Sequence, residues 1–276
     1  MTSNQFVHEQ SSQQWTPGPR IYNLFPLLAG PLSSWEPHLE RAQRLGFNWV
    51  YINPFHAAGY SGSLYAIKDY YTVDPRLLDL SQSRVDQADQ ADYAGPPEVQ
   101  LKRMLGTAQR LGLKVMMDLV INHTAFDSVL VSQYPNWYKY DADGKQVHPS
   151  AKDGNNEVVW GDLAEIDNAD SPDREQLWLY WLTLVEYYAG LGFDGFRCDA
   201  AYKVPTELWQ FLIPGLKHTY PDRLFVAESL GCPIGETVRL AQAGFDYIFN
   251  SSKWWDWTGQ WCLDHYRQAA PWAPSI

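Results

Sequence analysis

The chain has 276 residues, 45% of them apolar or aromatic, so it is long enough to bury one large core, and one main domain is the default expectation. Acidic residues outnumber basic ones by 32 to 21, and the scattered Lys and Arg residues exclude the charge pattern of a nucleic-acid-binding protein. No run of about 18 apolar residues occurs, and residues 1–20 form a polar leader without the features of a secretory signal, so we expect no membrane partner and a cytoplasmic location.

Short β-rich segments alternate with longer amphipathic ones, which is typical of βα repeats around a parallel sheet. Six strands are predicted, at Ile21–Phe25, Trp49–Asn53, Lys114–Val120, Gly195–Asp199, Leu224–Glu228 and Phe245–Phe249. The first five are followed by helices predicted from apolar residues at helical spacing, at Ser34–Leu45, Pro97–Leu111, Ser171–Leu191, Pro205–Lys217 and Ile234–Ala243. This order predicts an α/β fold of the TIM (β/α)8-barrel type.

Two connections, residues 54–96 and 123–170, are longer than a compact domain normally contains, and long ordered loops are usually functional. We expect both over the C-terminal face, with 123–170 as a small irregular subdomain inserted after the third strand into a barrel made of 21–122 and 171–276. A barrel needs eight strands, and this sequence ends soon after the sixth, so we expect an incomplete barrel and favour a fragment of a longer gene product over an unusual closure.

Three consecutive strands of the predicted barrel end in carboxylates: Asp118, Asp199 and Glu228. The C-terminal strand ends are where barrel active sites are built. Because side chains alternate along a strand, Arg197 and Asp199 point to the same side while Cys198 points to the helices. An Arg beside a carboxylate keeps it ionised, as a nucleophile requires.

The apolar residues before Glu228 predict a raised pKa for its carboxyl group, which could then hold the proton that a departing sugar oxygen needs. Two carboxyl groups about 5–5.5 Å apart would give retention through a glycosyl-enzyme intermediate. A single strand-end Asp is more often a helix N-cap, and Arg197 with Asp199 could be only a salt bridge. The combination of three carboxylates at consecutive strand ends with Arg and His at fixed offsets favours catalysis.

From about Ile21 to Asn250 the chain resembles the α-amylase superfamily of retaining glycoside hydrolases and transglycosylases. Three runs of the chain resemble the first, second and third conserved blocks of this family: Asp118-Leu119-Val120-Ile121-Asn122-His123, Gly195-Phe196-Arg197-Cys198-Asp199-Ala200-Ala201 and Phe225-Val226-Ala227-Glu228. A fourth run, Trp160-Gly161-Asp162-Leu163, resembles an extra block of the family. The family's fourth block, which supplies a further Asp, has no counterpart here.

The resemblance implies catalytic roles for residues of these blocks. Asp199 would be the nucleophile, Glu228 the general acid/base, and Arg197 the residue that orients and ionises the nucleophile. Asp118 would support them from behind, and His123 would hydrogen-bond the sugar that undergoes cleavage.

Other implied roles concern substrate and metal. Tyr65 would stack under the same sugar, and Asp69 continues its motif. Lys203 would contact a glucose unit on the leaving-group side, or simply cap a helix. No cofactor is required, but Asn122 could be a ligand of a structural calcium ion.

The main hypothesis is a retaining α-glycosidase that acts on α-glucans or maltooligosaccharides by double displacement. An alternative is an intracellular α-glucan transglycosylase, such as a maltosyl or glucosyl transferase or a trehalose-synthase type. A catalytically silent glucan-binding fragment is an alternative of another class. A metal- or phosphate-dependent barrel is disfavoured, because the sequence has no Gly-rich phosphate loop and no cluster at metal-ligand spacing.

Overall fold

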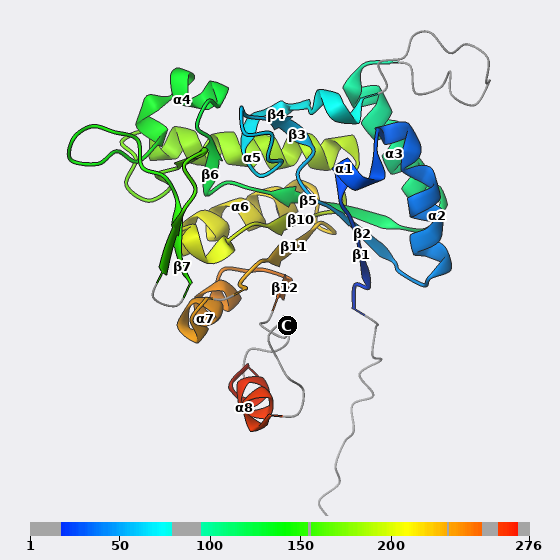
Figure 1. Cartoon of the computed structure of the whole chain (residues 1–276). Coiled ribbons are helices and arrows are strands. Elements are labelled where there is room, and N and C mark those ends of the chain that lie inside the picture. The colour runs from blue at the N-terminus through cyan, green and yellow to red at the C-terminus, as the bar shows by residue number, and fades with distance from the viewer. Residues whose placement is uncertain (1–17, 79–94, 154–155, 231, 250–258, 270–276) are drawn as a thin grey trace, which may run out of the picture.

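The computed structural model describes residues 18–78, 95–153, 156–230, 232–249 and 259–269. Its centre is one sheet of six parallel strands, in the spatial order β1-β2-β5-β10-β11-β12 (Figure 1). These strands are β1 (Ile21–Leu24), β2 (Trp49–Ile52), β5 (Lys114–Leu119), β10 (Gly195–Cys198), β11 (Leu224–Ala227) and β12 (Tyr247–Ile248). All six lie where the sequence predicts strands. Most of the expected polar leader lies outside the described residues.

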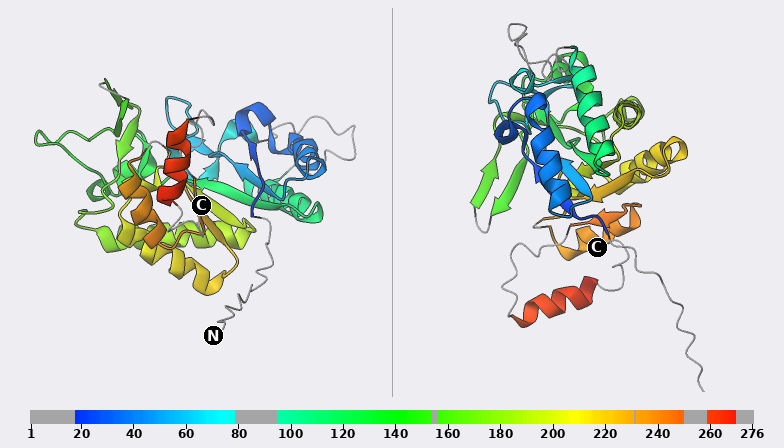
Figure 2. Two further views of the ribbon diagram at one scale, coloured as in Figure 1. Left: turned by 90° about the horizontal axis from the view of Figure 1, so that it is seen from below. Right: turned by 90° about the vertical axis from the view of Figure 1, so that its right-hand side faces the viewer.

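Each of the first five strands is followed by a helix of the outer layer, and neighbouring helices contact one another. The helices are α2 (Glu36–Arg44), α3 (Pro97–Arg110), α5 (Arg174–Leu191), α6 (Thr206–Thr219) and α7 (Ile234–Gln242). Figure 2 shows them along one side of the curved sheet. Gly192 ends α5 with a φ of 119°, a left-handed conformation that glycine adopts without a Cβ clash. The predicted βα order is therefore confirmed.

The sheet has an apolar cluster on each face. The larger cluster lies between the strands and the helix layer and includes Phe196 and Cys198. The smaller one, on the concave inner face, is formed by Trp49, Met116 and Val226. The alternation predicted from the strand period is thus observed, because Cys198 is buried on the side opposite to Arg197.

The two long connections carry short antiparallel sheets. The first holds β3 (His56–Ala58) paired with β4 (Ile67–Val73), and the second holds β6 (His123–Ala125) with β9 (Leu163–Glu165) and β7 (Ser150–Asp153) with β8 (Asn156–Val159). The expected division into barrel and inserted subdomain stays a prediction.

Short helical segments complete the described chain. They are α1 (Pro26–Ala29), α4 (Val129–Gln133), α8 (Gln260–Ala269) and the 3-10 turns η1 (Leu32–Ser34), η2 (Pro75–Leu77), η4 (Pro135–Trp137) and η5 (Ala201–Lys203). No helix among the described residues has the length and apolar character needed to cross a membrane.

Candidate active site

The strand register brings the predicted catalytic residues together. Arg197 of β10 lies directly beside Asp118 of β5, and Cys198 lies beside Ala227 of β11. Asp199 and Glu228 follow the last residues of β10 and β11, where their backbone N–H groups still donate to carbonyls of the neighbouring strands. The parallel sheet therefore delivers both carboxyl groups to the same edge.

The Arg197 guanidinium group is the centre of this cluster. Its Nη1 donates to Asp118 Oδ1 and Oδ2 at 2.8 and 3.0 Å and to Asp199 Oδ1 at 2.7 Å, and its Nη2 lies 3.7 Å from Glu228 Oε2. Only 11% of the Arg197 side chain is exposed. Burial disfavours the cation, but the charges of Asp118 and Asp199 outweigh it and raise the pKa of Arg197. A permanently charged group thus faces three carboxyl groups.

Asp118 lies beneath the other two carboxyl groups and is completely buried. The pKa of Asp118 is raised to about 6, because burial and the charge of Asp199 raise it more than Arg197 lowers it. The hydroxyl of Tyr51 also donates a hydrogen bond to Asp118 Oδ2. Burial and the Asp118 charge raise the pKa of Tyr51, so the phenol keeps its proton and remains a donor.

Glu228 is held by its oxygen Oε2. This atom accepts a hydrogen bond from the backbone N–H of Ala200 at 2.7 Å and faces the Arg197 cation. The pKa of Glu228 is raised, mainly by burial. The Arg197 charge lowers this pKa, and the Asp199 charge raises it. An oxygen that faces an N–H donor and a cation is a poor place for a proton, so the proton of the neutral acid belongs on Oε1.

Ala200 has an unusual backbone. Within the described residues it alone among non-glycine residues has a positive φ, at 40°, and its ψ is 46°. The left-handed conformation costs an alanine roughly 1–2 kcal/mol. It turns the chain immediately after Asp199 and aims the N–H at Glu228, so the strain occurs where the two carboxyl groups are positioned.

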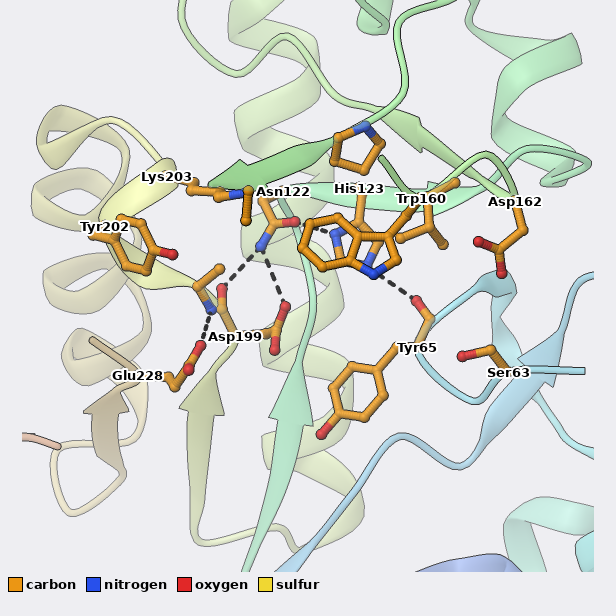
Figure 3. Close-up of a pocket in the computed structure, with 14 residues that line it drawn as sticks. Ser63, Tyr65, Asn122, His123, Trp160, Asp162, Asp199, Tyr202, Lys203 and Glu228 are labelled. Carbon is orange, nitrogen blue, oxygen red and sulfur yellow. Dashed lines mark hydrogen bonds between the residues drawn. The ribbon is translucent and has the colours of Figure 1, made fainter. Parts of the chain in front are cut away.

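A cavity of about 420 Å³ opens above the carboxyl groups (Figure 3). Its walls come from three strand ends and both long connections. The lining residues are Ser63, Tyr65, Asn122, His123, Pro149, Ala151, Trp160, Asp162, Leu163, Asp199, Ala200, Tyr202, Lys203 and Glu228. The volume lies in the range of small-ligand sites, and the wall combines rings with a few polar groups, as such sites usually do.

Three further predicted residues line this cavity. His123 lies with Nε2 3.2 Å from the carbonyl oxygen of Tyr65, and its Nδ1 contacts Asn122 Oδ1. Burial lowers the pKa of His123, so the ring is neutral at pH 7. The Asn122 amide donates to the backbone and the side chain of Asp199, at 3.1 and 3.3 Å. Asn122 therefore helps to orient the predicted nucleophile.

The structure places Lys203 and Asp69 in local contacts. Lys203 lines the cavity, but its Nζ donates to the Ser150 carbonyl at 2.8 Å and lies 5.5 Å from the centre of the Trp160 ring. Asp69 does not line the cavity, and its carboxylate accepts from the Tyr71 N–H and the Thr72 hydroxyl. Their substrate-binding roles stay predictions.

Two site residues were missed in the sequence. The phenol of Tyr51 bonds Asp118 and lies 3.3 Å from the Tyr65 hydroxyl, and the amide of Asn53 donates to both phenols, at 3.1 and 2.9 Å. The sequence does contain a pattern that could have predicted them. Tyr51 and Asn53 are polar residues at alternate positions near the end of β2, so both side chains lie on the inner face of the sheet. They hold Tyr65 against the cluster.

A metal at this site finds little support in its geometry. Among the described residues no group of three or more His, Cys, Asp or Glu side chains could hold an ion. The Asn122 amide oxygen faces His123, and its nitrogen faces Asp199. A calcium ion at Asn122 stays a prediction.

Comparison with known proteins supports this description. Residues 20–143 match the family model of the glucanotransferase domain of glycogen debranching enzyme. The chain is 26% identical over 250 residues to an α-1,4-glucan:maltose-1-phosphate maltosyltransferase of Burkholderia pseudomallei, covering 90% of this chain and 20% of that protein. For the enzyme of the same name from Rhodospirillum rubrum the identity is 28% over 240 residues, covering 82% and 32%. The chain thus spans a third or less of these relatives' length.

Solved structures show the same architecture. An α-amylase from Lactobacillus plantarum superposes with a TM-score of 0.70 and 27% identity, over 91% of this chain and 59% of that one. A maltogenic α-amylase from Thermotoga neapolitana gives a TM-score of 0.69 and 25% identity, over 93% and 57%. The six-stranded parallel sheet with its helices thus matches part of the α-amylase TIM barrel. These findings support the α-amylase superfamily for this chain.

Proposed function

We propose that this chain carries the catalytic centre of a retaining α-glycosidase that acts on α-glucans or maltooligosaccharides by double displacement. The observation that carries the proposal is the shared contact of Asp199 and Glu228 with Arg197 at the edge of the cavity. The first carboxyl group has a permanent cation at 2.7 Å, and the second has a raised pKa. These are the properties of a nucleophile and of a general acid.

In the first step an oxygen of Asp199 attacks the anomeric carbon of the bound sugar. The bond between this carbon and the leaving oxygen breaks, and the proton on Glu228 Oε1 passes to that oxygen. Arg197 and Asn122 hold the attacking carboxylate, which limits its motion to the reactive direction. The neutral His123 ring and the Tyr65 phenol, both on the cavity wall, are placed to contact the sugar.

In the second step the Glu228 carboxylate removes a proton from the incoming hydroxyl group. The oxygen of that group bonds to the anomeric carbon while the bond to Asp199 breaks, which restores both carboxyl groups. Departure of the first leaving group leaves Glu228 charged, and the Ala200 N–H and Arg197 stabilise that charge at Oε2. The same residue thus acts as acid and then as base.

Transfer to a second sugar is the second candidate, and the names of the curated relatives favour it. Both relatives described above are maltosyltransferases, whereas the two solved structures are α-amylases. Hydrolysis and transfer share the first step and differ in the hydroxyl group that enters in the second. We therefore propose an α-glucan-processing enzyme whose acceptor is decided on the Glu228 side of the cavity.

Product analysis with maltoheptaose tests this proposal. The purified chain is incubated with this substrate alone and with excess glucose or maltose, next to Asp199→Asn and Glu228→Gln. We expect shorter products from the wild type, longer products as well if transfer occurs, and neither from the two variants. A folded wild type that leaves maltoheptaose intact, while still binding it, would contradict catalysis and support the glucan-binding alternative.

A further inference from the structure

The loop between β3 and β4, residues 59–66, borders one end of the catalytic cavity. Two of its residues, Ser63 and Tyr65, line the cavity. In Figure 3 they lie at the end opposite to Glu228. Glu228 gives its proton to the leaving oxygen, so the leaving group lies on its side and the transferred glycosyl group lies on the side of the loop. The position of the loop therefore affects the binding of the donor sugar.

Asp127, which does not line the cavity, joins this hairpin to the second long connection. Its Oδ1 accepts a hydrogen bond from the backbone N–H of Tyr60 at 3.1 Å, and its Oδ2 accepts one from Lys68 Nζ at 2.9 Å. The hydroxyl of the next residue, Ser128, donates to the Lys68 carbonyl at 2.8 Å. The Tyr60 phenol donates to the Gly161 carbonyl at 3.3 Å. Each of these bonds joins the first connection to the second.

The two connections approach each other closely at Asp127. A Cβ on Gly59 would overlap the Asp127 carboxylate and would lie 2.5 Å from the Cβ of Ala125. Ala66 of the loop packs with Ala125 and Leu163 of the second connection in a small buried cluster. Only a residue without a Cβ allows such an approach. The contact with Asp127 therefore fixes where the loop begins.

The contribution of Asp127 to stability should be small. Its side chain is 31% exposed and that of Lys68 is 44% exposed, and exposed ion pairs add little to stability. Burial raises the pKa of Asp127, but the hydrogen bonds from Lys68 and Tyr60 outweigh this effect and hold the pKa below its usual value. Asp127 is thus a charged acceptor at neutral pH, and its loss should leave a folded protein.

We infer that Asp127 is a positioning residue for the donor sugar, because its bond to the Tyr60 N–H holds the loop at a fixed distance from the second connection. The inference rests on the proposed function and adds a residue outside the cavity that controls donor binding. The two catalytic carboxyl groups are held separately, by Arg197 and by the Ala200 N–H. Asp127 should therefore affect the binding of the donor and leave the cleavage of its bond unchanged.

The test measures fluoride release from α-maltosyl fluoride with saturating glucose as acceptor, because the sugar of this substrate occupies only the donor side. Asp127→Ala removes both acceptor oxygens, Asp127→Asn keeps Oδ1 for the Tyr60 N–H, and Lys68→Met removes only the ion pair. We expect Asp127→Ala to raise the KM for the donor by about three- to tenfold with kcat unchanged. The other two variants should stay within about twofold of wild type. Asp143→Ala is the matched control, because Asp143 is an exposed acid of the same connection that does not line the cavity.

The binding of α-maltosyl fluoride to Asp199→Asn, with and without Asp127→Ala, gives a reading that does not need turnover. Weaker binding by the same factor, with an unfolding midpoint in urea close to that of wild type, supports the inference. An unchanged KM, a fall in kcat alone, or a variant that does not fold overturns it. An equal rise in KM for Asp127→Asn or Lys68→Met also overturns it, because the effect would then belong to the ion pair. Absence of fluoride release by wild type would refute the proposed function, while the binding titration would still decide about Asp127.

Discussion

Replacing Arg197 with Met removes the cation of the site and keeps most of the side-chain volume. Arg197 Nη1 makes three contacts of 2.7 to 3.0 Å with Asp118 and Asp199, and both carboxyl groups are largely buried. Loss of one partner of a buried ion pair costs about 3–5 kcal/mol. We expect the free energy of unfolding of Arg197→Met to fall by about this amount near pH 8, with loss of activity.

The loss should depend on pH because Asp118 can take up a proton. Its folded pKa of about 6 lies above the unfolded value of about 3.9, so its contribution to stability is largest when it is protonated and falls as the pH rises through this range. Without Arg197 the folded pKa of Asp118 rises further, and the decline continues above about pH 6. The difference in unfolding free energy between wild type and variant should therefore be smaller near pH 5 than near pH 8.

Urea-induced unfolding of both proteins at the two pH values measures this difference. The control is Arg223→Met, because Arg223 lies 3.8 Å from Asp194, is 21% exposed and does not line the catalytic cavity. We expect the control to lose about 1 kcal/mol or less from this pair. A loss below about 1 kcal/mol in Arg197→Met, or an equal loss at both pH values, would refute the reasoning.

Three further predictions concern the backbone and the acid of the site. Gly195→Ala would place a Cβ 2.7 Å from the Leu224 carbonyl oxygen of the neighbouring strand, so urea unfolding should show a loss of about 1–3 kcal/mol; a variant as stable as wild type would contradict this. Ala200→Gly should keep the left-handed turn and the activity, whereas Ala200→Val should lower kcat because a β-branched residue rarely adopts this conformation. Equal kcat values for the two variants would show that the turn does not position Glu228. Because the pKa of Glu228 is raised, kcat/KM should be high below this pKa and fall as the pH rises through it, at a pH above the usual carboxyl pKa of about 4.3. A fall of kcat/KM at or below the usual value would assign the acid to another group.

The sequence predicted the strands and helices that position the site, because the spacing of apolar residues that indicates them is a local pattern. All six strands of the sheet and the five helices of the outer layer lie within a few residues of their predicted positions. The deviations have local causes: α5 begins at Arg174 rather than Ser171, because the Ser171 hydroxyl accepts from the Asp173 N–H in a turn that precedes the helix. Asp199 and Glu228 lie just beyond β10 and β11 rather than in them.

Contacts between distant segments could not be predicted in this way. The alternation of side chains places Arg197 on the inner face, but its contact with Asp118 also requires the register between β10 and β5. Lys203 is close to Asp199 in the sequence, yet its hydrogen bond to Ser150 depends on the fold of the second long connection. The antiparallel pairing of β3 with β4 and of β7 with β8 was not predicted either.

The central claim, that Asp199 forms a glycosyl-enzyme intermediate, is tested most directly by trapping it. The purified chain is treated with a 5-fluoro-α-glycosyl fluoride, and its peptides are analysed by mass spectrometry. We expect a glycosyl adduct on the peptide that contains Asp199, and no adduct in Asp199→Asn. An adduct on another residue, or turnover of this substrate with inversion at the anomeric carbon, would contradict it.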